Sequence, residues 1–86
     1  MKELTQRQKQ HVDFIENYIM RKGYPPTVRE IGGALGIGST NGVITNLRYI
    51  QIKGFLEIDE GVPRGIRVLK LSDGTPVRVA LVKVTP

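Results

Sequence analysis

Residues 27–54 contain two helix-start signals in close succession, and this spacing constrains the fold more than any other feature of the chain. Thr27-Val28-Arg29-Glu30 has the pattern of a capping box, in which the Thr and Glu side chains satisfy backbone N–H groups at a helix start. Gly36 can adopt the left-handed conformation that ends such a helix, and Ser39 or Thr40 can cap the next one. The pattern therefore predicts two short helices joined by a tight turn, over residues 28–35 and 40–53.

Each of these two helices has one apolar face, so both can pack on a common core. The apolar positions recur at helical spacing and are Val28, Ile31 and Leu35 in the first helix and Val43, Leu47 and Ile50 in the second. Gly32 lies inside the first helix, where glycine costs up to about 1 kcal/mol relative to alanine. We interpret Gly32 as a point of close approach between helices. Two helices joined in this way form a helix-turn-helix, in which the first supports and the second reads.

Helical and strand-like patterns flank this motif. A second capping box at Thr5–Gln8, followed by the stop Gly23-Tyr24-Pro25-Pro26, predicts a helix over residues 6–22. After Gly54 the apolar pattern alternates, which predicts a β-hairpin with strands at 55–58 and 66–69. A turn at 72–75 and a Val-rich strand at 77–84 follow. The predicted fold class is α+β, a winged helix-turn-helix with three helices, a hairpin wing and an extra C-terminal strand.

Composition narrows the classes of function. The chain has 86 residues, a net charge of +5, a single histidine (His11) and no cysteine, which allows one small domain with a modest core. Thiolate chemistry, disulfides and cysteine-based metal sites are excluded. No apolar run approaches the length of a membrane span, and the N-terminus lacks a signal-peptide pattern. We expect a basic cytoplasmic domain that is not an enzyme, without metal, cofactor or small-molecule ligand, and with His11 on the surface.

The side of helix 40–53 opposite its apolar arc carries groups suited to base edges. Asn41, Thr45 and Arg48 lie there, with Ile44 at the flank. An Asn amide can bind adenine through two hydrogen bonds, an Arg guanidinium can bind guanine, and the methyl groups of Thr and Ile can contact thymine. This face predicts a DNA-reading surface. The alternative interpretation is a three-helix scaffold whose polar face is only solvated.

Several segments together carry a family resemblance: LTQRQKQ at 4–10, KGYPPTVREIGGALGIGSTNGV at 22–43, KGFLEI at 53–58 and RGIRVL at 64–69, with Leu47. Over about residues 3–70 the chain resembles the N-terminal DNA-binding domain of the LexA repressors, which govern the bacterial SOS response. The resemblance implies a winged helix that binds operator DNA through its third helix, with the wing on the backbone or minor groove. By position, the family's base-reading segment falls on Ser39, Asn41, Gly42, Ile44, Thr45 and Asn46.

Further residues are predicted to contact the DNA backbone, because cations, hydroxyls and helix N-termini suit phosphate. They are Arg7, Thr27, Arg29, Thr40, Lys53, Arg64 and Arg67. Arg64 and Arg67 flank the wing tip, where the alternative is ordinary solvated charge. For Arg29 the alternative is a local pair with a carboxylate, and for Lys53 it is a favourable position at a helix C-terminus.

The chain departs from the family in two respects. Gly42, Val43 and Ile44 stand where the family commonly carries polar or acidic residues, so the family's operator sequence is not carried over. The family's protease domain, with its Ala-Gly cleavage site and Ser/Lys pair, has no match in these residues, whose only serines are Ser39 and Ser72. We therefore expect no self-cleavage from this chain, which is either a short regulator, such as a phage could encode, or a part of a longer protein.

The functional prediction is a sequence-specific double-stranded DNA-binding regulator, a LexA-like repressor of SOS-type or phage genes. Residues 1–70 would form the DNA-binding domain and residues 71–86 a C-terminal strand extension. That strand completes the wing sheet or pairs with a second copy, because an apolar edge strand can add to another sheet; a homodimer could also form on DNA. The alternative is a protein-interaction module, an anti-repressor or co-regulator, that uses the C-terminal strand or the Ile44/Ile52 side of the third helix.

Overall fold

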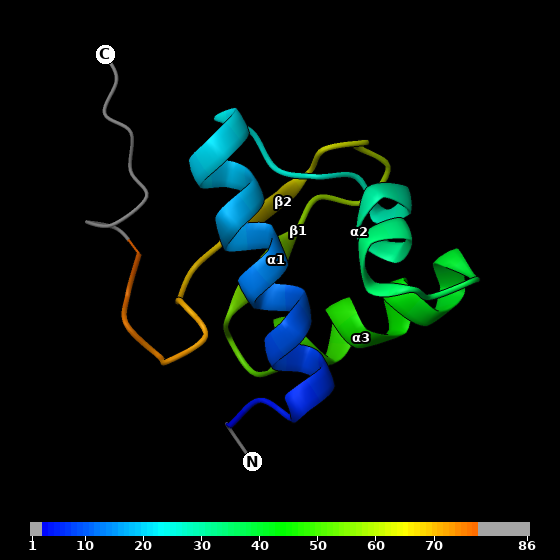
Figure 1. Cartoon of the computed structure of the whole chain (residues 1–86). Coiled ribbons are helices and arrows are strands. Elements are labelled where there is room, and N and C mark those ends of the chain that lie inside the picture. The colour runs from blue at the N-terminus through cyan, green and yellow to red at the C-terminus, as the bar shows by residue number, and fades with distance from the viewer. Residues whose placement is uncertain (1–2, 78–86) are drawn as a thin grey trace.

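The computed structural model describes residues 3–77. The described elements are α1 (Gln6–Lys22), α2 (Val28–Leu35), α3 (Thr40–Ile52), β1 (Leu56–Ile58) and β2 (Ile66–Val68). The two strands pair antiparallel, with Leu56 opposite Val68 and Ile58 opposite Ile66. Figure 1 shows the hairpin behind α1, with α2 and α3 to one side. The predicted α+β winged helix-turn-helix is confirmed.

The helices begin and end at their local signals. At α2, the Thr27 Oγ1 accepts the Glu30 N–H at 3.1 Å and the Glu30 Oε1 accepts the Thr27 N–H at 2.9 Å, and Thr5 and Gln8 make the same reciprocal pair at α1. Gly36 ends α2 with a φ of 72°, in the left-handed region that glycine tolerates. The helix predicted over 40–53 ends one residue earlier, because Lys53 is its C-cap.

The core lies where the helices meet the hairpin. Its buried side chains are Val12, Ile15, Ile31, Val43, Leu47, Ile50, Phe55, Leu56 and Ile66. A Cβ on Gly32 would lie 3.3 Å from the Val43 Cγ2 and 3.2 Å from the Ile37 carbonyl oxygen. The close approach predicted at Gly32 is therefore confirmed, and it sets how closely α2 lies against α3.

Residues 59–65 form the loop at the tip of the hairpin, which we call the wing loop. The Asp59 N–H donates to the Gly65 carbonyl at 2.7 Å, and the Gly65 N–H donates to the Val62 carbonyl at 3.0 Å. A Cβ on Gly65 would lie 2.8 Å from the Val62 Cβ, so only glycine fits without a shift. β1 begins one residue later than predicted, because the N–H of Phe55 donates to the carbonyl of Ile50, at the end of α3, at 3.2 Å. β2 ends one residue earlier than predicted, at Val68.

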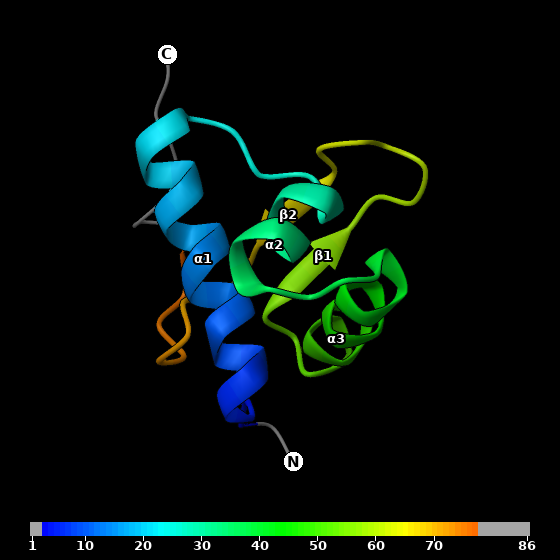
Figure 2. The same cartoon turned by 45° about the vertical axis from the view of Figure 1, so that its right-hand side comes forward.

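The segment after β2 turns back along α1. The Gly74 N–H donates to the Leu71 carbonyl at 2.8 Å, which closes the predicted turn at 72–75. The Glu16 carboxylate on α1 accepts the Ser72 N–H at 2.6 Å, and Val77 is buried. In both views this segment lies beside α1, on the side away from α3 (Figures 1 and 2). Beyond Val77, the strand predicted over 77–84 lies outside the described residues.

His11 is buried, and the expectation that it lies on the surface was wrong. The buried positions of α1 are Gln8, His11, Val12, Ile15 and Tyr18, so His11 belongs to the helix face that meets the core. Its Nδ1 lies 2.8 Å from the Arg7 carbonyl oxygen, which fixes the proton of the neutral ring on Nδ1. Its Nε2 is buried without a hydrogen-bond partner among the described residues. Burial lowers the pKa of His11 below its usual value.

Two adjacent glycines of α2 should respond in opposite directions to alanine. Gly33 has nothing within 4 Å of an added Cβ, so Gly33→Ala should stabilise the chain by about 0.5–1 kcal/mol through helix propensity. Gly32→Ala should destabilise it, because the Ile37 backbone in its way is tied by its N–H to the Gly32 carbonyl at 2.9 Å. Urea unfolding of both variants measures the difference. Equal effects would contradict the close approach of α2 and α3.

His11 should make the fold weaker in mild acid. Its pKa in the folded chain is lowered, so the unfolded chain binds a proton more readily and the free energy of unfolding falls as pH drops below about 6.5. Urea unfolding at pH 8 and pH 5.5 measures this loss. His11→Gln should reduce it, whereas an unchanged loss in that variant would assign the pH dependence to another group.

Candidate nucleic-acid interface

The apolar face of α3 fixes which side of the helix is free. Val43, Leu47 and Ile50 are at most 1% exposed, and because the helix turns about 100° per residue, its opposite side faces outward. Asn41, Thr45 and Arg48 lie on that exposed side. Figure 2 shows α3 at the edge of the molecule, away from residues 71–77. The described part of the C-terminal segment therefore leaves this side of α3 uncovered.

The first turn of α3 presents hydroxyl and amide groups together. Ser39 is the N-cap, and its Oγ accepts the Gly42 N–H at 3.2 Å, which leaves its hydroxyl proton free to donate. Thr40, the first helical residue, is exposed. A helix N-terminus combines unpaired N–H groups with a positive dipole end, so this turn is chemically suited to a phosphate oxygen.

Asn41, Thr45 and Arg48 form an exposed row along α3, and the other predicted base-reading residues of this helix are less exposed. A Cβ on Gly42 would lie 3.0 Å from the Ile37 Cγ2, so Gly42 faces the turn before α3. The Asn46 Nδ2 donates to the Gly42 carbonyl at 3.0 Å, and Asn46 is half-buried. Ile44 lines a hollow of about 170 Å³ between α3 and the wing loop. Roles for these residues in reading bases stay predictions.

One exposed ion pair spans that hollow. The Arg48 Nη2 lies 4.0 Å from a carboxylate oxygen of Glu60 in the wing loop, and both side chains are mostly exposed. A pair of this length and exposure contributes little to stability. The Arg48 guanidinium is therefore available to a stronger acceptor, such as a base edge or phosphate.

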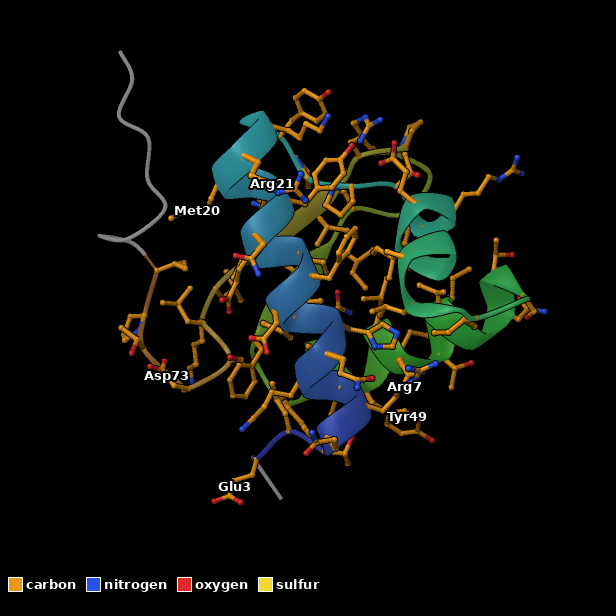
Figure 3. The ribbon with its side chains drawn as sticks, in the orientation of Figure 1. Glu3, Arg7, Met20, Arg21, Tyr49 and Asp73 are labelled. Atoms are coloured by element: carbon orange, nitrogen blue, oxygen red, sulfur yellow. The ribbon has the colours of Figure 1, made fainter. Side chains whose placement is uncertain are left out.

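Among the predicted backbone-contacting residues, Arg7 and Arg29 are the exposed cations of the helices. The Arg7 Nη1 donates to the Gln10 Oε1 at 2.9 Å, and its Nη2 lies 3.4 Å from the Leu35 carbonyl oxygen. Figure 3 shows Arg7 and Tyr49 toward the beginning of α1, with Met20 and Arg21 at its other end. Arg29 lies in the first turn of α2. Both side chains are exposed, as contacts to phosphate require, and those contacts stay predictions.

Three other predicted backbone-contacting residues already have partners. The Lys53 Nζ donates to the Gln8 Oε1 at 2.7 Å and to the Glu3 carbonyl at 2.8 Å, so it joins the end of α3 to the start of α1. The Arg67 Nη2 lies 3.1 Å from carboxylate oxygens of both Glu57 and Asp59. Thr27 caps α2 through its hydroxyl oxygen. These residues have less capacity for a new partner than the sequence suggested.

Arg64 is the most extensively bound cation of the set. Its Nη1 lies 2.8 Å from the Glu30 Oε1, 2.9 Å from the Pro25 carbonyl oxygen and 3.3 Å from the Tyr18 hydroxyl. Its Nη2 donates to the Glu30 Oε2 at 3.0 Å, which completes a two-pronged pair. The guanidinium carbon lies 4.8 Å from the centre of the Tyr24 ring. These hydrogen bonds lower the pKa of Glu30 to about 2 and raise the pKa of Arg64.

Sequence reasoning missed two features of this surface. The first feature is the pair between Glu30 and Arg64. The capping box already explained a Glu at position 30, so nothing in the sequence indicated a second, distant partner. The second feature is Tyr49, which is 55% exposed. Its spacing of four residues from Thr45 could have placed it on the same side of α3. Ile52, which the sequence did place on an outer side of this helix, is 77% exposed.

Within residues 3–77, the structure has no helix that is long and apolar enough to cross a membrane. In the same residues, no cluster of three or more His, Asp or Glu side chains is placed to hold a metal ion.

Comparison with known proteins gives a consistent family. Residues 1–65 match the family model of the LexA DNA binding domain. The LexA repressor of Parafrankia sp. is 48% identical over 79% of this chain and 27% of its own length. The LexA repressor of Staphylococcus haemolyticus is 42% identical over 80% of the chain and 33% of its own length. That of Bacillus cytotoxicus is 41% identical over 99% of the chain and 44% of its own length. The chain thus spans less than half the length of these relatives.

Acid should weaken the fold through Glu30. The pKa of Glu30 is about 2 in the folded chain and 4.5 without its partners, so its stabilisation is present above about pH 4.5 and is lost as pH falls toward 2. Urea midpoints at pH 5 and pH 3 measure this loss, which Glu30→Gln should reduce. Asp13→Asn, which removes an exposed carboxylate from α1, should keep the wild-type loss. The same loss in Glu30→Gln as in the wild type would show that the pair with Arg64 does not stabilise the fold.

Proposed function

The chain belongs to the LexA DNA-binding domain family, and from this premise we propose that it is a sequence-specific repressor that binds double-stranded DNA. The observation that carries the proposal is the exposed side of α3, where Asn41, Thr45 and Arg48 follow one another at helical spacing. The name of the relatives, LexA repressor, supports a role in repression. The genes controlled would be of the SOS type or of phage origin, and the protein would act in the cytoplasm.

In this mechanism α3 enters the major groove with its exposed side toward the base edges. The Asn41 amide is suited to adenine, the Arg48 guanidinium to guanine and the Thr45 methyl group to a thymine methyl. Ser39 supplies a hydroxyl at the start of the helix. Each well-formed two-bond contact would contribute about 1–3 kcal/mol of discrimination between bases. Gly42, Ile44 and Asn46 would shape the fit beside these groups.

Contacts to phosphate would hold the domain in register. Arg7 and Arg29 are exposed cations, and Thr40 lies at the N-terminus of α3. Contacts by Thr27, Lys53 and Arg67 would require these side chains to share or exchange their present partners. The net charge of +5 favours association with DNA, and each phosphate neutralised would make the slope of log affinity against log salt more negative by about 0.9.

Repression would follow from occlusion, because a domain bound at a promoter keeps the polymerase away. A single winged-helix module covers only about 600–1,000 Å² of interface. Tight binding would therefore use two copies on a two-fold operator, with half-sites about one helical turn, or a multiple of it, apart. Pairing of the predicted strand 77–84 between two copies is one way to form such a dimer.

A protein-interaction module is the second candidate. Tyr49 and Ile52 are large apolar side chains exposed on α3, and exposed apolar groups that lie together are typical of contact surfaces between proteins. An anti-repressor or co-regulator could bind a partner there. Such a module would show little preference among DNA sequences and a weak dependence on salt.

The double substitution Asn41→Ala, Thr45→Ala should abolish preference for the duplex that the wild-type protein selects from a random-sequence library. The lost contacts discriminate between bases, whereas phosphate contacts persist and maintain binding to unrelated duplexes. Fluorescence anisotropy with the selected duplex and a scrambled duplex measures both affinities.

Asn17→Ala is the matched control, because Asn17 is an exposed Asn on α1, and this variant should retain the preference. If the double variant also retains it, α3 is not the reading helix. If the wild-type protein selects no duplex at all, the DNA-binding proposal fails and the second candidate takes its place.

A further inference from the structure

Arg64 joins the wing loop to the helical body. It lies in the wing loop, and its partners come from α1, from α2 and from the segment between them: Tyr18, Glu30, Pro25 and Tyr24. We propose that Arg64 and Glu30 form a wing latch, which sets the position of the wing relative to α3 and so positions the wing for DNA, and that Arg64 is a positioning residue and not a phosphate contact. This role rests on the proposed DNA-binding function.

The geometry of the guanidinium supports this role. Both of its terminal nitrogens face Glu30, at 2.8 and 3.0 Å. The two hydrogens of Nη1 already have three acceptors within 3.3 Å, namely Glu30, the Pro25 carbonyl and the Tyr18 hydroxyl. The aromatic ring of Tyr24 covers the guanidinium at 4.8 Å. A phosphate could bind both terminal nitrogens only by displacing the carboxylate from its two-pronged pair, which is the strong arrangement for this side chain.

Few other polar contacts hold the wing loop. Apart from Arg64–Glu30, one ion pair among the described residues joins the wing loop to a helix. It is Arg48–Glu60, whose charged atoms lie 4.0 Å apart and whose side chains are exposed. The backbone hydrogen bonds of the loop run within the hairpin, such as that from Asp59 to Gly65.

The strands on either side of the loop are anchored by Leu56 and Ile66 in the core, and the Ile58 N–H donates to the Gln51 Oε1 of α3 at 2.7 Å. The wing latch therefore adds a tie at the tip of the hairpin, beyond these anchored strands.

The partner of Arg64 is also tied to the reading helix. Glu30 belongs to the capping box that starts α2, and α2 packs against α3 at Gly32, where an added Cβ would lie 3.3 Å from Val43. The wing latch thus fixes the wing on the same support that fixes α3. A duplex that contacts both would meet two surfaces already held in their bound arrangement, which lowers the entropic cost of binding.

Glu30→Gln separates this role from a phosphate contact because the two predict opposite signs. A Gln at position 30 can still accept the Thr27 N–H, so the capping box survives. If Arg64 binds phosphate, removing its competing carboxylate should tighten DNA binding. If Arg64 positions the wing, the same substitution frees the wing loop and should weaken binding.

The first measurement uses the free protein. Amide hydrogen exchange at Asp59, Val62 and Gly65, whose N–H groups are bonded within the wing loop, should accelerate about tenfold in both Glu30→Gln and Arg64→Gln, because the loop then opens more often. Asp13→Asn, which removes a carboxylate from α1, should leave these rates unchanged. Unchanged exchange in Glu30→Gln would overturn the wing latch, whatever the DNA results are.

The second measurement uses the duplex selected by the wild-type protein and a scrambled duplex of equal length. Both variants should bind about tenfold more weakly to each duplex, with the wild-type dependence on salt, because no phosphate contact is lost. The double variant should be no weaker than the weaker single variant, since both disrupt one pair. Tighter binding by Glu30→Gln, or a salt slope reduced by about one in Arg64→Gln, would overturn the positioning role.

The experiments can reject the proposed function and the wing latch independently. If the wild-type protein selects no duplex, the proposed function fails, and the exchange rates still test whether the wing latch holds the loop. If the wild-type protein selects a duplex and Glu30→Gln binds it more tightly, the DNA-binding function stands and the positioning role of Arg64 is wrong.

Discussion

The close approach of α2 to α3 at Gly32 is the contact on which the rest of the surface depends. An added Cβ there would lie 3.3 Å from Val43 and 3.2 Å from the Ile37 carbonyl, so a larger residue would require Val43 or the Ile37 backbone to shift by a few tenths of an ångström. Because Val43 is held inward, the residues on the opposite side of α3 face outward. Glycine at position 32 costs the helix at most about 1 kcal/mol in propensity. The close packing that it allows helps to determine which side chains of α3 can meet a ligand.

Charge on this molecule is less available than its total suggests. The net charge is +5, yet several cations near the wing and the end of α3 are bound to groups of the chain itself. Arg64 is paired with Glu30, Arg67 with Glu57 and Asp59, and Lys53 with Gln8. Arg7 on α1 and Arg29 on α2 are exposed. Attraction to DNA would therefore arise mainly from the helices, with the wing contributing shape more than charge.

The sequence predicted what local signals control. Capping boxes and glycine stops placed the helices to within a residue, because both act through hydrogen bonds between near neighbours. The exposed row on α3 followed from helical periodicity in the same way.

Features that depend on what each side chain contacts in the folded chain were not predicted from the sequence. Arg64 and Glu30 lie far apart in the sequence, and each had a sufficient local explanation, as wing charge and as helix cap. His11 was assigned from its residue type, whereas its position on the buried stripe of α1 decides its environment. Gly42 and Asn46 were taken from a family pattern, but the turn before α3 and the helix backbone engage them.

The carboxylate of Glu30 is shared between the start of α2 and the tip of the hairpin, since its Oε1 lies 2.9 Å from the Thr27 nitrogen and 2.8 Å from the Arg64 Nη1. A change in one of these two parts of the molecule therefore removes a partner from the other. A hairpin transplanted onto this helical body needs an arginine at position 64, and a replacement α2 needs a carboxylate in its first turn. A chimera that meets only one of these two requirements would keep the helices and strands. It would lose the contact that aligns the hairpin with α2.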